Sequence, residues 1–397
     1  MTPLAITSST LTNSLGRGQY ATLNALRDNR SGLRPCDFMD AELATWIGKV
    51  DGLDDFAVTG TLAQYDCRNN RLAQLGLQQD RFIDAVENAK ARYGSNRIAV
   101  IMGTSTSGIL LTEQAFRQRD SETGKLPDSF HYTETHELSA VAEFSRRYLG
   151  LTGPSMAIST ACSSSAKVFA SAQRLIAAGL CDAAVVGGVD SLCFTTLYGF
   201  ASLELVSPRP CRPADANRDG ISIGEAAGFA LLERVAAAPA GGIALLGYGE
   251  STDAHHMSTP HPEGLGARLA MERALQRAGL QTDEIDYINL HGTASKSNDG
   301  AEDKAVAGLF GSRTPCSSTK GWTGHTLGAA GITEAIIGSL CIEHGFMPGS
   351  LNTETVDPAF SSRILLHSRN QAVRHVVSNS FGFGGNNCSV VLGRIGA

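Results

Sequence analysis

The amino-acid sequence predicts an α/β fold of two similar halves, stacked in five layers. Buried apolar runs alternate with helical patterns along the 397 residues, which is typical of sheets whose strands are largely parallel. Helical segments that follow Cys162 and Thr326 are apolar on nearly every side, so neighbours must cover them all round. Such helices fit between two sheets, and the similar style of the two halves suggests an internal duplication.

The first half of the chain carries four predicted strands. Each is an apolar run bounded by turn signals, and they cover residues 97–102, 155–159, 181–189 and 227–232. A helix follows the second strand, because apolar residues recur at helical spacing from Ala166 to Leu180 and Gly179 marks its end. Around residues 236–242 the pattern loosens. We therefore predict one domain over residues 1–240 and a second over residues 241–397.

The second half repeats this alternation. Apolar runs predict strands at residues 243–248, 285–290, 372–380 and 388–392. Helical spacing predicts helices at residues 266–278, 300–310 and 327–344. Asp299 and Glu302 stand at the start of the second of these helices, where exposed acids are common.

The composition excludes several classes of protein. Hydrophobic residues make up 42% and charged residues 18% of the chain, which argues against disorder. The formal net charge of −6 gives no bulk attraction to nucleic acid or to an anionic membrane. No apolar stretch approaches the roughly 20 residues of a membrane span, and the N-terminus shows no signal-peptide pattern. Nine dispersed cysteines indicate reduced thiols, so we expect a cytoplasmic protein.

Cys162 stands in the sequence Thr-Ala-Cys-Ser-Ser, between a predicted strand and a predicted helix. A thiol at a helix start lies near unpaired backbone N–H groups and the positive end of the helix dipole. That setting favours the nucleophilic thiolate. The alternative is a small buried cysteine that packs a tight turn, since buried free cysteines are common.

Three other segments supply partners for this thiol. His291 follows the predicted strand at residues 285–290, at the end where α/β folds place functional loops. Lys320 and His325 stand five residues apart in a glycine-rich loop that opens the most apolar helix. A second glycine-rich loop, residues 379–387, presents backbone N–H groups that suit an oxyanion. The plainer alternatives are a solvent-facing histidine in a turn and glycines used for close packing.

One thiol, two imidazoles and an ammonium have a coherent joint chemistry. A thiolate that accepts an acyl group forms a thioester. Two neutral imidazoles that carry hydrogen on Nε2 donate together to one developing oxyanion, here an enolate. Neither imidazole then needs to be a strong base, in contrast to a protease-like pair in which one histidine activates the thiol.

These residues occur in motifs that resemble one family of enzymes. From about residue 95 to residue 393, the chain is similar to the elongating β-ketoacyl-ACP synthases. These are the condensing enzymes of type II fatty acid and polyketide synthesis, and ACP is the acyl carrier protein. The motifs follow the family's order and spacing, and they are residues 160–164, 218–220, 224–226, 290–293, 320, 323–325, 327–331 and 379–386.

The resemblance implies a thiolase-type fold, which is a duplicated αβαβα sandwich, and a decarboxylative Claisen condensation. Cys162 would take the acyl chain from acyl-ACP. His291 and His325 would assist the decarboxylation of malonyl-ACP. Lys320, paired with Glu302, would hold these groups in place and complete the catalytic set.

Other roles follow from the same resemblance. The oxyanion hole and the gate to the acyl pocket would consist of Cys162, Phe383 and Phe381. The residues in contact with substrate would be Thr106, Thr293 and Thr323. The arginines that would meet the acidic carrier are Arg209, Arg68 and Arg71, with ordinary solvated arginine as the alternative. No cofactor is required, but in some members a structural monovalent cation is surrounded by the residues that match Asn289, Glu302, Glu334, Ser378 and Asn379.

A few positions depart from the family's usual residues. Ser295 stands where threonine is usual and keeps a hydroxyl, and Ala214 replaces a common phenylalanine away from the chemistry. Thr106 falls where the family lines the far end of the acyl pocket, and its polarity favours a chain other than simple saturated lipid. Fatty acid, polyketide and aryl-polyene elongation all stay open.

Two alternatives also stay open. A degradative, CoA-dependent thiolase would use a second late cysteine, but Cys388 has a different glycine context and fits a packing role. A chain-length-factor-like partner of another synthase typically lacks the nucleophile that this chain has. The expected partners are acyl-ACP, malonyl-ACP and a dimer subunit, either a second copy or a related synthase or chain-length factor. Nucleic acid and membrane are not expected as partners. His255, His256 and His261 form a cluster in the sequence, but they lack the spacing of a zinc site, and their loop resembles the substrate-entrance loop of the family.

Overall fold

The computed structural model describes residues 1–238 and 241–396 of the chain. Its longer strands are β1 (Leu4–Asn13), β5 (Ile98–Gly103), β6 (Ser155–Ile158), β7 (Ala183–Asp190), β9 (Ala226–Arg234), β10 (Ile243–Thr252), β16 (His375–Gly382) and β17 (Asn386–Arg394). Its shorter strands are β2 (Gly16–Arg17), β3 (Arg34–Pro35), β4 (Trp46–Gly48), β8 (Ile223–Gly224), β11 (Tyr287–Asn289), β12 (Pro315–Ser317), β13 (Phe346–Met347), β14 (Arg363–Ile364) and β15 (Arg369–Asn370).

The two halves of the chain place five strands each in the same order. Hydrogen-bonded neighbours follow the order β14-β12-β11-β16-β17-β10-β1-β9-β7-β5-β6. β14 is an additional edge strand of the second half; if the other five strands of each half are numbered along the chain, both halves have the order 3-2-4-5-1. The halves meet where β1 pairs antiparallel with β10, with Leu4 opposite Leu245. The repeated order is the structural sign of a duplication. The predicted domain boundary falls beside residues 239–240, which lie outside the described residues, so the domain limits stay a prediction.

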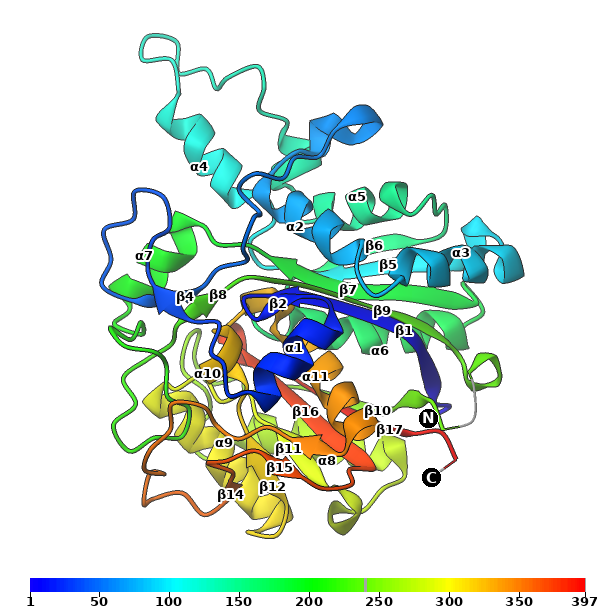
Figure 1. Cartoon of the computed structure of the whole chain (residues 1–397), viewed down its shortest axis with the longest axis vertical. Helices are drawn as coiled ribbons and strands as arrows, with labels where there is room; N and C mark the ends of the chain where they lie inside the picture. The colour runs from blue at the N-terminus through cyan, green and yellow to red at the C-terminus, as the bar shows by residue number, and fades with distance from the viewer. Residues whose placement is uncertain (239–240, 397) are drawn as a thin grey trace.

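The helices complete a stack of five layers (Figure 1). Their bounds are α1 (Gln19–Arg27), α2 (Arg68–Leu77), α3 (Phe82–Tyr93), α4 (Ile109–Arg117), α5 (Ala140–Tyr148), α6 (Ser164–Ala177), α7 (Phe194–Ser202), α8 (Leu265–Ala278), α9 (Lys296–Phe310), α10 (Lys320–Thr323) and α11 (Ala330–His344). α2, α3 and α5 contact the outer face of the first half-sheet, and α8 and α9 cover the second. α6 and α11 contact each other and both half-sheets, so they form the middle layer. The five-layer prediction is therefore confirmed.

The two central helices differ in how completely they are buried. Every residue of α11 from Ala330 to Ile342 is buried, as the sequence predicts. α6 instead keeps a polar edge that includes the exposed Arg174, so the prediction of burial on every side is wrong for α6. The helices approach closely at Gly331, where an added Cβ would lie 2.4 Å from the backbone nitrogen of Ala166. Glycine is required there because nothing larger fits between the two backbones.

Three features of the sheet differ from the sequence predictions. The pairing is mixed rather than largely parallel, because β1, β9, β10 and β17 all run antiparallel to their neighbours. β6 lies at the open edge of the sheet and is partly exposed, not buried. β1 was not predicted at all, because its core positions include threonine hydroxyls as well as apolar groups. Among the described residues, no helix has the length and apolar character needed to cross a membrane.

Candidate active site

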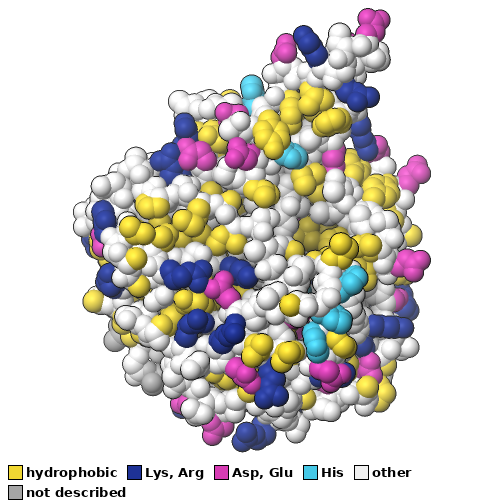
Figure 2. All heavy atoms as spheres, turned by 180° about the vertical axis from the view of Figure 1, so that it is seen from behind, with side chains coloured by type: hydrophobic (Ala, Val, Ile, Leu, Met, Phe, Trp, Pro, Cys, Tyr) yellow, Lys and Arg dark blue, Asp and Glu magenta, His cyan; other side chains and the backbone are white. Residues whose placement is uncertain are grey.

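The structure brings the predicted thiol and both predicted imidazoles to one cavity. Cys162, His291 and His325 line it together, and the Sγ and a ring nitrogen of each histidine lie within 4.8 Å of one another. The wall also carries the apolar side chains of Phe200 and Ile221 and hydroxyl and amide groups of the segment 293–298. On the face seen in Figure 2, histidine side chains gather beside a hollow rimmed by hydrophobic side chains. The site is thus an apolar cavity with a few convergent polar groups.

Cys162 lies in the turn between β6 and α6. The preceding residue, Ala161, has a φ of 51°, a left-handed conformation that is strained for a residue with a side chain. The Ala161 carbonyl accepts hydrogen bonds from the backbone N–H of Ser164 at 3.1 Å and from the hydroxyl of Ser105 at 3.2 Å. These contacts hold the turn, and the turn presents the thiol to the cavity at the start of α6.

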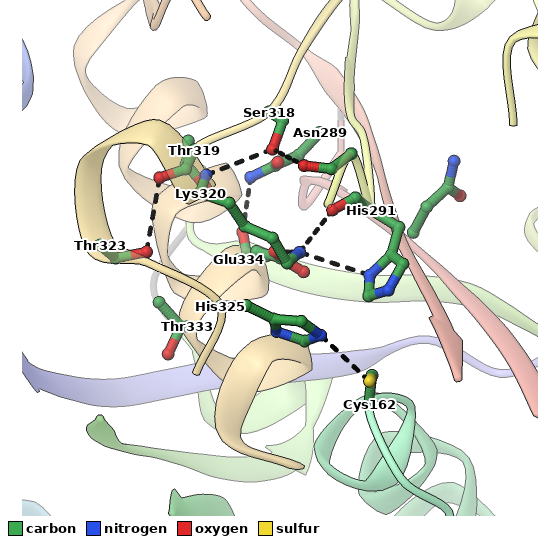
Figure 3. Close-up of polar contacts among 12 residues, drawn as sticks. Cys162, Asn289, His291, Ser318, Thr319, Lys320, Thr323, His325, Thr333 and Glu334 are labelled. Atoms are coloured by element: carbon green, nitrogen blue, oxygen red, sulfur yellow. Dashed lines mark hydrogen bonds and ion pairs between the residues drawn. The ribbon is translucent and has the colours of Figure 1, made fainter. Parts of the chain in front are cut away.

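His325 is the nearer of the two imidazoles to the thiol (Figure 3). Its Nε2 lies 3.0 Å from the Sγ of Cys162. The backbone N–H of Leu327 donates to its Nδ1 at 3.2 Å. Its own backbone is held beside β8, because its N–H donates to the carbonyl of Ser222 at 2.7 Å. The ring therefore has one fixed acceptor side and one side that faces the thiol.

His291 has its own fixed donor, the ammonium of Lys320. The Nζ of Lys320 lies 3.3 Å from the Nδ1 of His291 and 2.5 Å from its backbone carbonyl. The same Nζ forms a buried ion pair with Glu334 of α11. Figure 3 shows Lys320 between these two groups, away from the thiol. Lys320 thus orients His291 and does not face the reacting sulfur.

Both imidazoles present Nε2–H toward the thiol. Each Nδ1 accepts from a fixed donor, so in the neutral ring the hydrogen must be on Nε2. Burial, and then the charge of Lys320, hold the pKa of both His291 and His325 well below the usual value, so both rings are neutral at physiological pH. Two N–H donors, rather than two lone pairs, point at the centre of the group. The arrangement suits an oxyanion and not a metal ion.

The thiol of Cys162 is protonated at rest. Burial raises its pKa to about 11, and the charge of Lys320 and the backbone N–H of Phe383 oppose this rise only in part. The sequence prediction of a favoured thiolate is therefore wrong for the resting cavity, because desolvation outweighs the helix start. The thiolate forms with the help of the N–H groups that face the sulfur.

The raised pKa predicts how alkylation of Cys162 depends on pH. The rate with iodoacetamide should rise about tenfold for each pH unit between pH 7 and pH 9, because the thiolate fraction grows with pH below the pKa. Peptide mass spectrometry of time courses measures the rate at Cys162, with the half-buried Cys36 as an internal control. A rate that levels off below pH 8 would show that the thiolate is already formed in the resting protein.

Two phenylalanines border the cavity beside the thiol. Phe381, in β16, packs against His291 with ring centroids 6.1 Å apart. Phe383 follows β16, and its ring lies 5.5 Å from that of Phe200 on α7. Between them, Gly382 lies so close to the thiol turn that an added Cβ would be 3.1 Å from the backbone nitrogen of Cys162. The loop that carries Phe383 thus lies against the backbone of the thiol turn, and the backbone N–H of Phe383 faces the sulfur of Cys162.

In a comparison with known protein families, the chain matches both domains of one family. The model of the β-ketoacyl synthase N-terminal domain matches residues 1–238, and that of the C-terminal domain matches residues 243–354. The chain belongs to the β-ketoacyl synthase family. The family resemblance that the motifs predicted is confirmed.

Individual relatives agree with this family. The mitochondrial 3-oxoacyl-(acyl-carrier-protein) synthase of Arabidopsis thaliana is 40% identical over 62% of this chain, and the match spans 58% of that relative's length. The 3-oxoacyl-(acyl-carrier-protein) synthase 2 of Vibrio harveyi is 32% identical over 99% of this chain and 98% of its own. A solved ketosynthase from Xenorhabdus doucetiae, in complex with its chain length factor, is 41% identical, with a TM-score of 0.89 over 99% of this chain and 98% of that one. The thiolase-type fold predicted from the motifs is thereby confirmed.

Two carboxylates differ from the roles that the sequence suggests. Lys320 pairs with Glu334 and not with Glu302. Glu302 instead accepts the backbone N–H groups of His291 at 2.8 Å and Gly292 at 2.7 Å, and it holds the loop after β11. The reason is that α11 returns past α10, which brings Glu334 to the ammonium. Burial raises the pKa of Glu302 to about 7, although these N–H groups lower it.

Of the three threonines assigned to the substrate, one lines the cavity. Thr293 does so, next to Ser295. Thr106 is buried, and its hydroxyl donates to Asp190 at 2.9 Å, so it does not line the cavity. Thr323 is also buried, and its hydroxyl donates to the carbonyl of Gly324 at 2.8 Å. Both hydroxyls are therefore structural, which corrects the sequence assignment.

The three arginines assigned to the carrier differ in their surroundings. Arg68 is 7% exposed and forms a buried ion pair with Glu225, so its assignment to a carrier surface is wrong. Arg71 is half-buried and makes a bidentate pair with Asp66. Arg209 is the exposed one, with more than half of its side chain in solvent. Only Arg71 and Arg209 stay available to a partner.

Sequence reasoning missed residues that line the cavity or fix the groups around Cys162 and His325. Phe200 lines the cavity from α7, and Leu327 sets the tautomer of His325 through its backbone N–H. Asp190 accepts hydrogen bonds from the loop that contains Ser105. The signal for Asp190 was present, since an acid that ends a buried strand in an α/β fold stands where functional loops begin.

Proposed function

We propose that the protein is a β-ketoacyl-ACP synthase that extends a Cys162-bound acyl chain by decarboxylative Claisen condensation with malonyl-ACP. The observation that carries the proposal is the pair of Nε2–H donors, from His291 and His325, that face one thiol in a cavity. The family and the named relatives support the same reaction.

In the first half-reaction, the Cys162 sulfur attacks the thioester carbonyl of acyl-ACP. The N–H groups of Cys162 and Phe383 would hold the oxyanion, as an oxyanion hole does. The carrier thiolate leaves and takes up the proton that the thiol lost. The acyl chain then remains on Cys162 as a thioester, which splits one difficult step into two easier ones.

In the second half-reaction, malonyl-ACP places its thioester oxygen between the two imidazoles. His291 and His325 donate Nε2–H to this oxygen while the bond to the carboxylate breaks and CO₂ leaves. The enolate carbon attacks the acyl carbonyl on Cys162, the new carbon–carbon bond forms and the carbon–sulfur bond breaks. β-Ketoacyl-ACP leaves, and the Cys162 thiolate that is released takes up a proton from solvent, which restores the resting thiol. Lys320 and Glu334 hold His291 and do not react.

The two alternatives fit the geometry less well. A degradative thiolase needs a second cysteine near the first, but Cys388 is buried in the core of β17. A chain-length-factor-like partner needs no assembled thiol and imidazoles, and here they are assembled. A catalytic subunit that pairs with such a partner stays compatible with both the solved Xenorhabdus doucetiae complex and this site.

A dimer is the quaternary state that we propose. β6 ends the sheet with an unpaired edge, and the partly exposed Met156 and Ile158 lie along it. Open edges of this kind pair with another strand. The Xenorhabdus doucetiae ketosynthase complex supports a related subunit as the partner, and a second copy of this chain is the other candidate. The nine free thiols support a reducing compartment, and we propose the cytoplasm.

A structural monovalent cation fits beside the site, and no other cofactor is proposed. Asn289 Oδ1, Glu334 Oε2 and Ser378 Oγ are buried without a hydrogen-bond partner in the described residues. Glu302 and Asn379 already use their oxygens, since Glu302 accepts backbone N–H groups and the Asn379 Oδ1 accepts from Ser389. The first three residues would hold the ion, while the other oxygen of Glu334, Oε1, stays paired with Lys320.

Acylation of the protein tests the proposed function. Incubation with acyl-ACP should add one acyl group, which peptide mass spectrometry places on Cys162. Addition of malonyl-ACP should then remove the group and yield β-ketoacyl-ACP, which is two carbons longer than the donor chain. An acyl group on another residue, or cleavage of β-ketoacyl-CoA by CoA in its place, would overturn the proposal.

A further inference from the structure

Asp190 is a buried acid for which the reaction above has no use. It is the last residue of β7, and it is completely inaccessible to solvent. Its carboxylate has no cationic partner within salt-bridge distance among the described residues. A buried charge of this kind is costly unless several donors compensate it. The donors that surround Asp190 therefore indicate what the carboxylate is for.

Those donors come from two separate segments of the chain. Asp190 Oδ1 accepts the hydroxyls of Thr104 at 2.6 Å and Thr106 at 2.9 Å, together with the backbone N–H of Thr106 at 3.0 Å. Oδ2 accepts the backbone N–H of Ser105 at 3.0 Å and that of Gly328 at 2.5 Å. One carboxylate thus joins the loop after β5 to the turn before α11.

The first segment leads to the nucleophile. The backbone of Ser105 is fixed by Asp190, and the Ser105 hydroxyl donates to the carbonyl of Ala161 at 3.2 Å. Ala161 holds the strained left-handed conformation that presents Cys162. Strained backbone persists only where the surroundings enforce it. Asp190 therefore helps to enforce the conformation of Ala161 indirectly, through Ser105.

The second segment leads to His325. Gly328 follows Leu327, whose φ of 52° is also left-handed, and the Leu327 N–H donates to the Nδ1 of His325. The carboxylate approaches this turn so closely that a Cβ on Gly328 would lie 2.6 Å from Asp190 Oδ2. Through this turn, Asp190 fixes the donor that keeps hydrogen on the Nε2 of His325.

We propose that Asp190 is a positioning residue that holds, from one carboxylate, both the turn of Cys162 and the Nε2–H tautomer of His325. It touches neither the thiol nor the imidazole. An asparagine of the same shape could not replace it, because an amide presents at least one N–H toward donors that all need acceptors. The tautomer of His291 does not depend on Asp190, since Lys320 sets it.

The test begins with the tautomers, which need no substrate. Nitrogen-15 NMR of histidine-labelled protein, with signals assigned by His291→Gln and His325→Gln, should show protonated Nε2 for both rings in the unaltered chain. In Asp190→Asn, His325 should show a mixture of tautomers while His291 keeps protonated Nε2. Pure Nε2–H at His325 in a folded Asp190→Asn protein would overturn the proposal.

The kinetic consequence rests on the proposed function. Release of CO₂ from malonyl-ACP by Asp190→Asn should fall about 10- to 100-fold in kcat, less than for complete loss of an oxyanion donor because part of His325 keeps Nε2–H, with KM changed less than threefold. If the chain proves not to be a synthase, this readout is lost, but the tautomer and the rate of Cys162 alkylation still decide the role of Asp190.

The matched control is Asp215→Asn. Asp215 is equally buried and accepts backbone N–H groups of Asn217, Glu354 and Thr355, away from the cavity. The Asp215→Asn variant should have a lower melting temperature but unchanged histidine tautomers and an unchanged rate of Cys162 alkylation. Equal effects of the two variants on tautomer and alkylation would reduce Asp190 to a general structural residue.

Two milder variants serve if Asp190→Asn does not fold. Ser105→Ala should slow the alkylation of Cys162 about threefold or more and leave the His325 tautomer intact. Gly328→Ala, which forces the turn away from the carboxylate, should produce mixed tautomers at His325. Unchanged alkylation in the first variant, or an unchanged tautomer in the second, would contradict the proposal for that branch.

Discussion

Cys162→Ala is expected to abolish acyl transfer and condensation, with a loss of at least about 10⁴-fold, because no other thiol of residues 1–238 and 241–396 lines the cavity. The fold should be unaffected, since alanine is smaller than cysteine and fits the same turn. Condensation is measured as β-ketoacyl-ACP formed per minute from acyl-ACP and malonyl-ACP. The control is Cys388→Ala, which removes a core thiol outside the cavity and should retain activity.

Cys162→Gln separates the two half-reactions. Its amide carbonyl occupies the place of the acyl thioester, so the second half-reaction can start without acylation. We expect release of CO₂ from malonyl-ACP at a rate equal to or above that of the unacylated wild type, with no condensation. Condensation that persists in either variant would remove Cys162 from the role of nucleophile.

His291→Ala and His325→Ala are each expected to lower CO₂ release from malonyl-ACP by about 10²- to 10³-fold, because each removes one donor to the developing oxyanion. The measurement belongs in the Cys162→Gln background, where acylation does not contribute. His325→Ala should also change the alkylation rate of Cys162, since its Nε2 contacts the sulfur, whereas His291→Ala should not.

The control for both variants is His375→Ala. His375 is a buried histidine at the start of β16, and its Nδ1 lies 2.9 Å from the carbonyl of Glu284, outside the cavity. The His375→Ala variant should release CO₂ at a rate within about threefold of that of the parent protein. If either His291→Ala or His325→Ala decarboxylates at the parent rate, that imidazole is not an oxyanion donor.

Burial explains which parts of the fold were predictable. α11 is buried from Ala330 to Ile342, so its sequence shows apolar residues on every side and the five-layer stack follows. β1 carries buried threonines such as Thr10 and Thr12, whose hydroxyls make its alternation weak. β6 looked buried because its residues are apolar, but it lies at the sheet edge. Apolar composition alone does not distinguish a core strand from an edge that awaits a partner.

Contacts between distant segments explain which parts of the site were not predictable. The motifs identified Cys162, His291, Lys320 and His325 correctly as neighbours. The family resemblance implied Glu302 as the partner of Lys320, yet the pairing depends on how α11 turns back over α10, which no local pattern records. The protonation of Cys162 was mistaken for the same reason. A helix start is visible in sequence, whereas the degree of desolvation depends on the whole cavity.

The ratio of CO₂ released to β-ketoacyl-ACP formed tests the central claim most directly. Malonyl-ACP labelled in the free carboxylate is mixed with protein already acylated on Cys162, and the gas and the carrier-bound product are measured in one turnover. The account predicts one CO₂ per β-ketoacyl-ACP and per acyl group lost from Cys162. Product that retains the labelled carboxyl, or loss of the acyl group to CoA without CO₂, would contradict it.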